Sequence, residues 1–317
     1  TNSLLVGTDS TGTLSSADEN TGVGIGVLAA LTSGDNNVAV GKNSLTANTT
    51  GSNNVSVGRQ SLDANTTGQK NVAVGQGALG ANTTANDNTA VGNSALATNT
   101  TGTENVAVGS GALTTNVTGV NGTAVGNDAL KLNTGDSNSA FGRRALCTNS
   151  SGSANVALGV NALLSNTTAN DNVAVGNAAL TTNTTGCENT AVGRCALKAN
   201  TTGIRNVAVG KGALKTNITG SSNVAIGREA LGVATNNNNT SVGFDSMQAT
   251  TTGADNTAVG MKALFTNTIG IGNTAIGTYA LQANTTACEN TAVGYVALST
   301  NTTGNLNSAF GRGALQV

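Results

Sequence analysis

The chain has 317 residues, of which 43 are glycine, none is proline or histidine, and 2% are aromatic. Its net charge of −1 gives no electrostatic basis for binding nucleic acid or an anionic membrane, and no apolar run is long enough to cross a bilayer. The composition is unlike that of ordinary globular domains, but the apolar residues keep a strict spacing that disordered chains lack. We therefore expect a folded protein with no nucleic-acid partner and no membrane insertion by this segment.

Residues 1–34 follow the pattern of the later sequence only weakly. Gly7 and Gly24 have the spacing of the later glycines, and Leu28 matches a later leucine, but Leu4, Leu5 and Leu14 do not fit. Atypical terminal repeats usually cap a repeat array or join it to a neighbour. We predict that 1–34 is a cap or junction, and that this chain is part of something longer.

Residues 35–317 form a continuous tandem repeat of the motif N-x-A-V-G-x-x-A-L. Fourteen of the 16 steps between successive copies are 17 residues, and the two ending at Gly142 and Gly243 are 16. A fixed short period with this much Gly, Asn and Thr predicts a parallel β-solenoid, an all-β fold in which each repeat forms one rung. The closing glycines of the motif are Gly41, Gly58, Gly75, Gly92, Gly109, Gly126, Gly142, Gly159, Gly176, Gly193, Gly210, Gly227, Gly243, Gly260, Gly277, Gly294 and Gly311.

Within one repeat, apolar and small residues alternate around the closing glycine. An apolar residue, usually Val, precedes it, and Leu follows four residues later in 16 copies, with Met247 in the other. Ala or Ser stands next to each of these positions. Because neighbouring side chains of a strand face opposite ways, we predict that Val and Leu point into the coil and Ala and Ser point outward. N-V-A-V-G and A-L are then two short strands, and N-T-T-G is the turn.

Two columns of asparagine run through the repeats, one opening the strand and one opening the turn. In register, identical Asn side chains form hydrogen-bonded ladders. N-T-T also matches the N-glycosylation sequon, so the turn asparagines have a second interpretation. We predict a structural role for the Gly, Val, Leu and Asn columns, represented by Asn71, Val74, Gly75, Leu79 and Asn82 in one repeat and by Asn172, Val175, Gly176, Leu180 and Asn183 in another.

Charged residues also occupy fixed positions in the repeat. Nine of the 14 basic residues lie one or two positions after a closing glycine, and ten of the 15 acidic residues lie five or six before a glycine of the frame. They predict two exposed stripes that bracket the strand. A solvated surface explains them, and pairing between chains or ligand contact is the alternative.

No residue pattern indicates catalysis, a metal or a cofactor. Histidine is absent, and the acids recur regularly rather than as a converging pair. Neither CxxC nor the calcium nonapeptide of RTX repeats occurs. Cys187 and Cys288 share a column but lie six rungs apart, too far for a disulfide within one chain, so these and Cys147 and Cys195 are expected to be incidental thiols.

One chain buries about one Val and one Leu per repeat, a thin core against the entropy of ordering 17 residues. The small residues expected on the outside would let a second chain approach closely. We therefore predict a symmetric homo-oligomer.

The recurring N-V-A-V-G, N-T-A-V-G and N-V-A-I-G motifs resemble the head repeats of trimeric autotransporter adhesins of the YadA type and related phage and viral tail-fibre repeats. The resemblance covers residues from about 20 to 317. It implies a left-handed β-roll, association of three chains, and an extracellular location at a cell or virion surface. The family repeat is typically about 14 residues, and no stalk, neck or membrane anchor follows here.

These observations favour a structural fibre or adhesin rod that gives reach and multivalent attachment to a host receptor or glycan. An ice-binding or glycan-binding solenoid is the alternative, although the paired Thr residues of the turn lack the T-x-T spacing of a flat ice-binding face. An enzyme on a β-helix is a third hypothesis, and nothing breaks the repeat to form a cleft.

Overall fold

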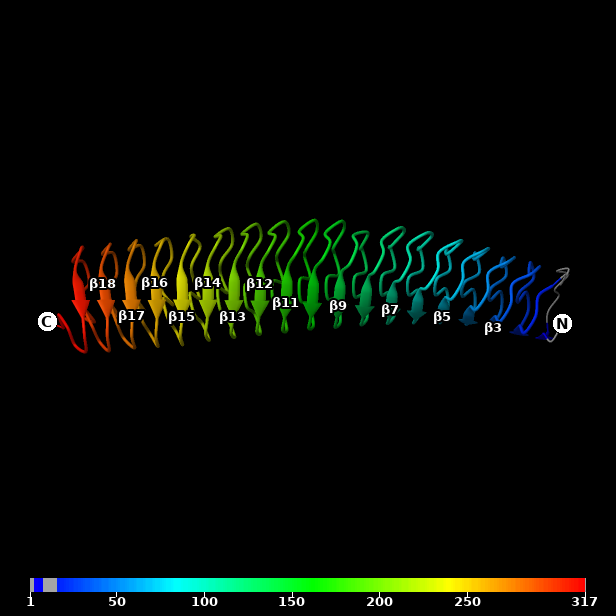
Figure 1. The fold of residues 1–317 in the computed structure, drawn as a ribbon, viewed down its shortest axis with the longest axis horizontal. Coiled ribbons are helices and arrows are strands. Elements are labelled where there is room, and N and C mark those ends of the chain that lie inside the picture. The colour runs from blue at the N-terminus through cyan, green and yellow to red at the C-terminus, as the bar shows by residue number, and fades with distance from the viewer. Residues whose placement is uncertain (1–2, 8–15, 317) are drawn as a thin grey trace. The chain divides into compact units, whose positions relative to one another are not determined.

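The computed structural model describes residues 3–7 and 16–316 and comprises two compact units, Thr1–Asn155 and Val156–Val317. Within the described residues, all regular secondary structure consists of three-residue β-strands. Figure 1 shows one strand in each turn of the coil, with the rest of the turn formed by irregular backbone. We call each such turn a rung.

Unit 1 contains β1 (Leu4–Val6), β2 (Thr21–Val23), β3 (Val38–Val40), β4 (Val55–Val57), β5 (Val72–Val74), β6 (Thr89–Val91), β7 (Val106–Val108), β8 (Thr123–Val125) and β9 (Ser139–Phe141). Unit 2 contains β10 (Val156–Leu158), β11 (Val173–Val175), β12 (Thr190–Val192), β13 (Val207–Val209), β14 (Val224–Ile226), β15 (Thr240–Val242), β16 (Thr257–Val259), β17 (Thr274–Ile276), β18 (Thr291–Val293) and β19 (Ser308–Phe310).

Successive strands within each unit pair in parallel, and each residue lies beside its counterpart in the next repeat. Ala73 of β5 pairs with Ala90 of β6, and Ala174 of β11 pairs with Ala191 of β12. The 16-residue repeats keep this register, since Ala225 pairs with Ser241 across the shorter step. The missing residue is therefore absorbed outside the strand. The prediction of an all-β parallel solenoid with rungs of about 17 residues is confirmed.

The predicted orientation of the strand residues is wrong. The middle residue, Ala or Ser, is fully buried, whereas the flanking residues are half-buried or exposed; Ala73 is 0% exposed between the half-buried Val72 and Val74. Val175 likewise lies beside the buried Ala174. Alternation holds, but the interior is narrow and takes the small side chain.

The width of the interior explains why it takes the small residue. The second Ala or Ser column, three residues after the closing glycine, is also buried and faces the first across the coil. Where both are serine, their hydroxyls meet: Ser44 Oγ donates to Ser56 Oγ at 2.7 Å. Two valines do not fit in this space, so Ala and Ser provide close packing within one coil rather than between chains.

The segment expected to be a second strand is a series of turns. Its leucine is fully buried, as predicted, but lies in the left-handed backbone region, with φ of 51° at Leu79 and 49° at Leu180. A left-handed L-residue costs about 1–2 kcal/mol, and full burial of Leu stabilises by about 1.5–3 kcal/mol. Burial therefore holds this residue in a conformation that its propensity disfavours, and the column can point into the coil without a strand.

The described part of residues 1–34 continues the same architecture. Strand β2 pairs in register with β3, and Val27 and Leu28 are fully buried. β1 pairs with β2 in the same way, while residues 1–2 and 8–15 lie outside the described residues. A capping or joining role for this segment stays a prediction.

Candidate functional site

The asparagines that open the strands form a buried hydrogen-bond ladder. The Asn71 backbone N–H and Nδ2 both donate to Asn54 Oδ1, at 3.0 and 3.2 Å, and Asn71 Oδ1 accepts from the Asn88 backbone at 3.0 Å. Asn172 Oδ1 accepts the same pair of bonds from Asn189. Each side chain therefore binds two rungs together and satisfies backbone groups that the short strand leaves unpaired.

The asparagines that open the turns form a second ladder. Asn82 Nδ2 donates to Asn65 Oδ1 at 2.8 Å and to the Ala85 carbonyl at 3.1 Å, and Asn183 Nδ2 donates to Asn166 Oδ1 and the Gly186 carbonyl. These side chains are fully buried. Their amides are committed to the protein interior, which argues against glycosylation at these positions.

The ladder is interrupted at both 16-residue repeats. Asn116 Oδ1 and Asn217 Oδ1 are buried without a hydrogen-bond partner. Asn217 faces the repeat in which Ala234 replaces the turn asparagine. In the other short repeat, Asn133 Nδ2 donates to the carbonyl of Gly135 instead. The shorter turn thus removes the donor that the preceding asparagine would meet.

The closing glycines allow rungs to stack closely. A Cβ on Gly75 would lie 2.6 Å from the carbonyl carbon of Gly92, and one on Gly176 would lie 2.7 Å from that of Gly193. Both glycines also have φ above 130°. Only glycine satisfies both constraints without strain. These glycines are structural residues, as expected.

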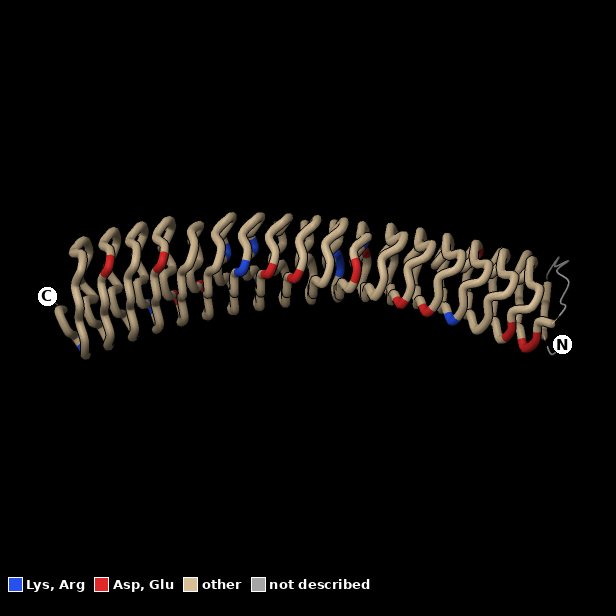
Figure 2. The backbone as a smooth tube through the Cα atoms, turned by 45° about the horizontal axis from the view of Figure 1, so that its top comes forward, with Lys and Arg blue, Asp and Glu red and all other residues tan. Residues whose placement is uncertain are grey.

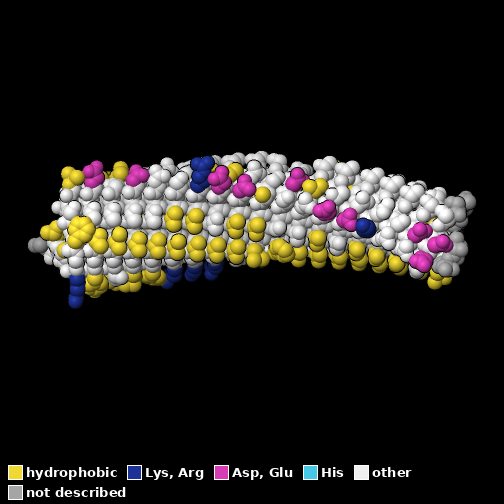
Figure 3. Space-filling view, viewed as in Figure 1, with side chains coloured by type: hydrophobic (Ala, Val, Ile, Leu, Met, Phe, Trp, Pro, Cys, Tyr) yellow, Lys and Arg dark blue, Asp and Glu magenta, His cyan; other side chains and the backbone are white. Residues whose placement is uncertain are grey.

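The outward side chains of the strands form an apolar strip along the sheet of each unit. We call this surface the sheet face; it consists of the residues one and three positions before each closing glycine. Within unit 2 it includes Leu158, Ile226, Val259 and Ile276, which are 37–48% exposed. Figure 3 shows the nearly continuous row of apolar side chains. An apolar surface of this length is typical of an interaction surface.

The sheet face has opposite charges along its two borders. In unit 2, Arg194, Lys211 and Arg228 follow the closing glycines of three successive repeats and are exposed. Asp171 and Glu188 lie on the other border, five residues before a closing glycine. Charged residues are otherwise sparse in both units, as Figure 2 shows. The Arg205–Glu188 pair, at 3.0 Å and largely exposed, joins two rungs on the acidic border.

The cysteines are free thiols among the described residues, with Cys147 buried and the other three half-buried. Cys187 and Cys288 accept hydrogen bonds from backbone N–H groups one rung earlier, at 3.4 and 3.3 Å. In unit 1 the oxygen of Asp35 accepts the equivalent bond from Asp18 at 2.8 Å. These two sulfurs thus substitute for the polar atom that the column uses elsewhere.

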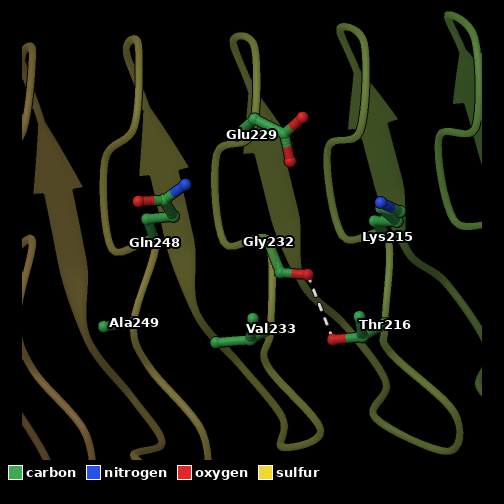
Figure 4. A pocket seen from close by; sticks show the side chains of 7 residues that line it. All are labelled: Lys215, Thr216, Glu229, Gly232, Val233, Gln248 and Ala249. Atoms are coloured by element: carbon green, nitrogen blue, oxygen red, sulfur yellow. Dashed lines mark hydrogen bonds between the residues drawn. The ribbon is translucent and has the colours of Figure 1, made fainter.

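Unit 2 also contains a surface hollow of about 410 Å³ that sequence analysis missed. It lies at the 16-residue repeat that ends at Gly243, where Gly232 interrupts a column that carries side chains in the neighbouring rungs. Aligning the repeats by their closing glycines would have revealed this gap. The hollow, which we call the Gly232 notch, is lined by Lys215, Thr216, Glu229, Gly232, Val233, Gln248 and Ala249 (Figure 4).

No group of three or more His, Cys, Asp or Glu side chains in the described residues has the arrangement of a metal site. In the same residues, no helix has the length and apolar character needed to span a bilayer. A scan against protein-family models finds no matching family, and a search of curated proteins finds no similar sequence. The functional argument therefore rests on the solenoid itself and its two surfaces.

Proposed function

We propose that this protein is a non-catalytic structural rod whose chains associate through the sheet face, and that it serves as a fibre or adhesin segment at a cell or virion surface. The supporting observation is the sheet face itself. Apolar side chains repeat along each unit at the strand spacing of about 4.8 Å and remain exposed in a single chain. Water contact with this strip is unfavourable, at about 25 cal/mol per Å² of apolar surface.

A second copy of this chain is the partner that best fits the sheet face. Its apolar columns have the same spacing, so side chains can match rung by rung along the contact. The basic border of one chain can also face the acidic border of the next around a symmetry axis, which pairs opposite charges at every contact. This arrangement favours a closed ring of chains. The number three is proposed from the resemblance to trimeric adhesin heads and fibre repeats.

Attachment would then rely on repetition. A rod with identical rungs presents the same groups many times, so weak binding to a surface receptor or glycan gains avidity without a deep pocket. The extracellular location and adhesive role belong to this proposal.

Light scattering coupled to size-exclusion chromatography, with electron micrographs of the same sample, tests the assembly. We expect a mass of three chains and thin rods. The double variant Val175→Lys/Val209→Lys should reduce the mass to one chain while the circular dichroism spectrum is kept, because two charges then occupy the sheet face. The matched control Thr168→Lys/Thr202→Lys adds the same charges at exposed turn positions and should leave the mass unchanged. A folded, monodisperse wild-type monomer would refute the proposal.

One observation favours ice binding as a second candidate. Four successive strands, β15 to β18, begin with an outward, half-buried threonine: Thr240, Thr257, Thr274 and Thr291. Together with the adjacent Val and Ile residues they form a flat array of methyl and hydroxyl groups. Thermal hysteresis in a freezing assay would support this function, and its absence would leave the structural rod.

A further inference from the structure

We propose that the Gly232 notch binds one unit of a neutral saccharide. This goes beyond the proposed rod, because the notch is built within unit 2 of a single chain and needs no second copy. Its volume of about 410 Å³ lies within the range of about 300–1,000 Å³ that is usual for small-molecule sites.

Two glycines in neighbouring rungs create the space. At Gly232, an added Cβ would have the Glu229 carbonyl oxygen at 3.2 Å and Gln248 Cγ at 3.7 Å, and the rest of the column position is open. At Gly212, a Cβ would lie 2.7 Å from both carboxylate oxygens of Glu229. The Glu229 carboxylate therefore rests against bare backbone at Gly212, beside the gap that Gly232 leaves.

The polar groups of the notch offer both acceptors and donors. Glu229 is half-buried and Lys215 is exposed, and the two line the same hollow without forming an ion pair within the described part of the chain. Gln248 adds an amide that can donate and accept. Thr216 Oγ1 donates to the Gly232 carbonyl at 3.1 Å, which fixes the backbone at the bottom of the notch (Figure 4).

These groups fit a sugar better than a simple ion. The charges of Lys215 and Glu229 cancel, so an anion or a cation would face one like charge. A sugar hydroxyl both donates and accepts, so it can satisfy carboxylate, ammonium and amide groups together. Val233, 39% exposed, and Ala249 provide the apolar contact for the C–H face of the ring.

The notch and the sheet face lie on different sides of unit 2. The strand arrows point downward in Figure 1 and upward in Figure 4, while the later residues stay on the left in both, so the two views look from opposite sides. A partner chain on the sheet face would therefore leave the notch accessible.

Saturation-transfer NMR on the wild-type chain tests the site. The probes are glucose, galactose, mannose and N-acetylglucosamine, with alanine as a zwitterionic comparison. We expect transfer to at least one of the sugars, reduced at least fivefold in Glu229→Gln and in Gly232→Leu. Leucine fills the notch, and the backbone at Gly232 is outside the left-handed region, so the fold accepts it.

Gly80→Leu is the matched control, because Gly80 occupies the same column in unit 1 and has only ordinary contacts at its Cβ position. It should leave the transfer unchanged. Absence of transfer to every sugar, transfer to alanine alone, or equal transfer in Gly232→Leu would each overturn the proposal. Particle mass measured on the same samples separates this result from the assembly: loss of sugar transfer with an intact oligomer concerns only the notch.

Discussion

Asn200 Nδ2 donates a 2.8 Å hydrogen bond to Asn183 Oδ1, so two buried side chains at equivalent positions join consecutive rungs. One repeat further, Asn217 Nδ2 donates to Asn200 Oδ1 at 3.0 Å, but its own Oδ1 has no partner. The ladder therefore ends where the repeat is one residue short. Asn183 and Asn217 are otherwise matched, since each also donates to a turn carbonyl at 2.9 Å.

This pair gives a first prediction. Asn183→Ala should lower the free energy of unfolding by about 1–3 kcal/mol more than Asn217→Ala, because it leaves one buried N–H of Asn200 unsatisfied. Chemical denaturation of both variants measures the difference. Equal losses would mean that the side-chain ladder adds nothing beyond the bonds to the turn carbonyls.

Two glycines of one repeat give a second prediction. Gly75→Ala places a Cβ 2.6 Å from the Gly92 carbonyl carbon, whereas Gly77→Ala meets only Ser94 Oγ at 3.9 Å. The φ values are 136° and 64°, so the Gly77 variant keeps only left-handed strain of about 1–2 kcal/mol. We expect Gly75→Ala to lower the melting temperature clearly more than Gly77→Ala does. The opposite order would refute the close stacking of closing glycines.

The leucine column gives a third prediction. Leu180→Asp should destabilise unit 2 by at least about 3 kcal/mol, because it removes a fully buried side chain and introduces a charge without a partner. Asn177→Asp, which introduces the same charge at an exposed position three residues earlier, should change stability by no more than about 0.5 kcal/mol. Thermal unfolding followed by circular dichroism compares the two. Similar melting temperatures would contradict the inward position of Leu180.

The pH dependence of stability gives a fourth prediction. Burial raises the pKa of the Asp63 carboxyl above its ordinary value, and hydrogen bonds from the backbone amides of Asp63 and Ala64 partly oppose this. The folded state then binds the proton more tightly than the unfolded state. Its contribution to stability is present below the ordinary pKa and is lost as the pH rises through the raised value.

Asp63→Asn removes this titration. The variant should therefore gain stability relative to wild type as the pH rises through the acidic range, and the difference should become constant above it. Denaturation midpoints measured across that range test the sign. A wild-type chain that gains on the variant with rising pH would contradict it.

Most of the architecture could be predicted from the sequence because the repeat is periodic. A step of 17 residues, recurring with Asn, Gly and Leu in fixed places, imposes equivalent environments and hence parallel pairing in register. The Asn columns indicated ladders for the same reason. The Gly232 notch did not follow from the consensus, because it comes from residues that depart from it.

The sequence by itself thus determined the repeat, the parallel register and the positions of the structural glycines. Only the tertiary structure decided which face of the strand is interior. Alternation of a strand allows two orientations one residue apart, and hydrophobicity alone favours burying valine. The two columns of small residues meet across a narrow coil, so space excludes valine and selects alanine. That steric choice leaves Val74, Val175 and their equivalents outside, where they form the surface available to another chain.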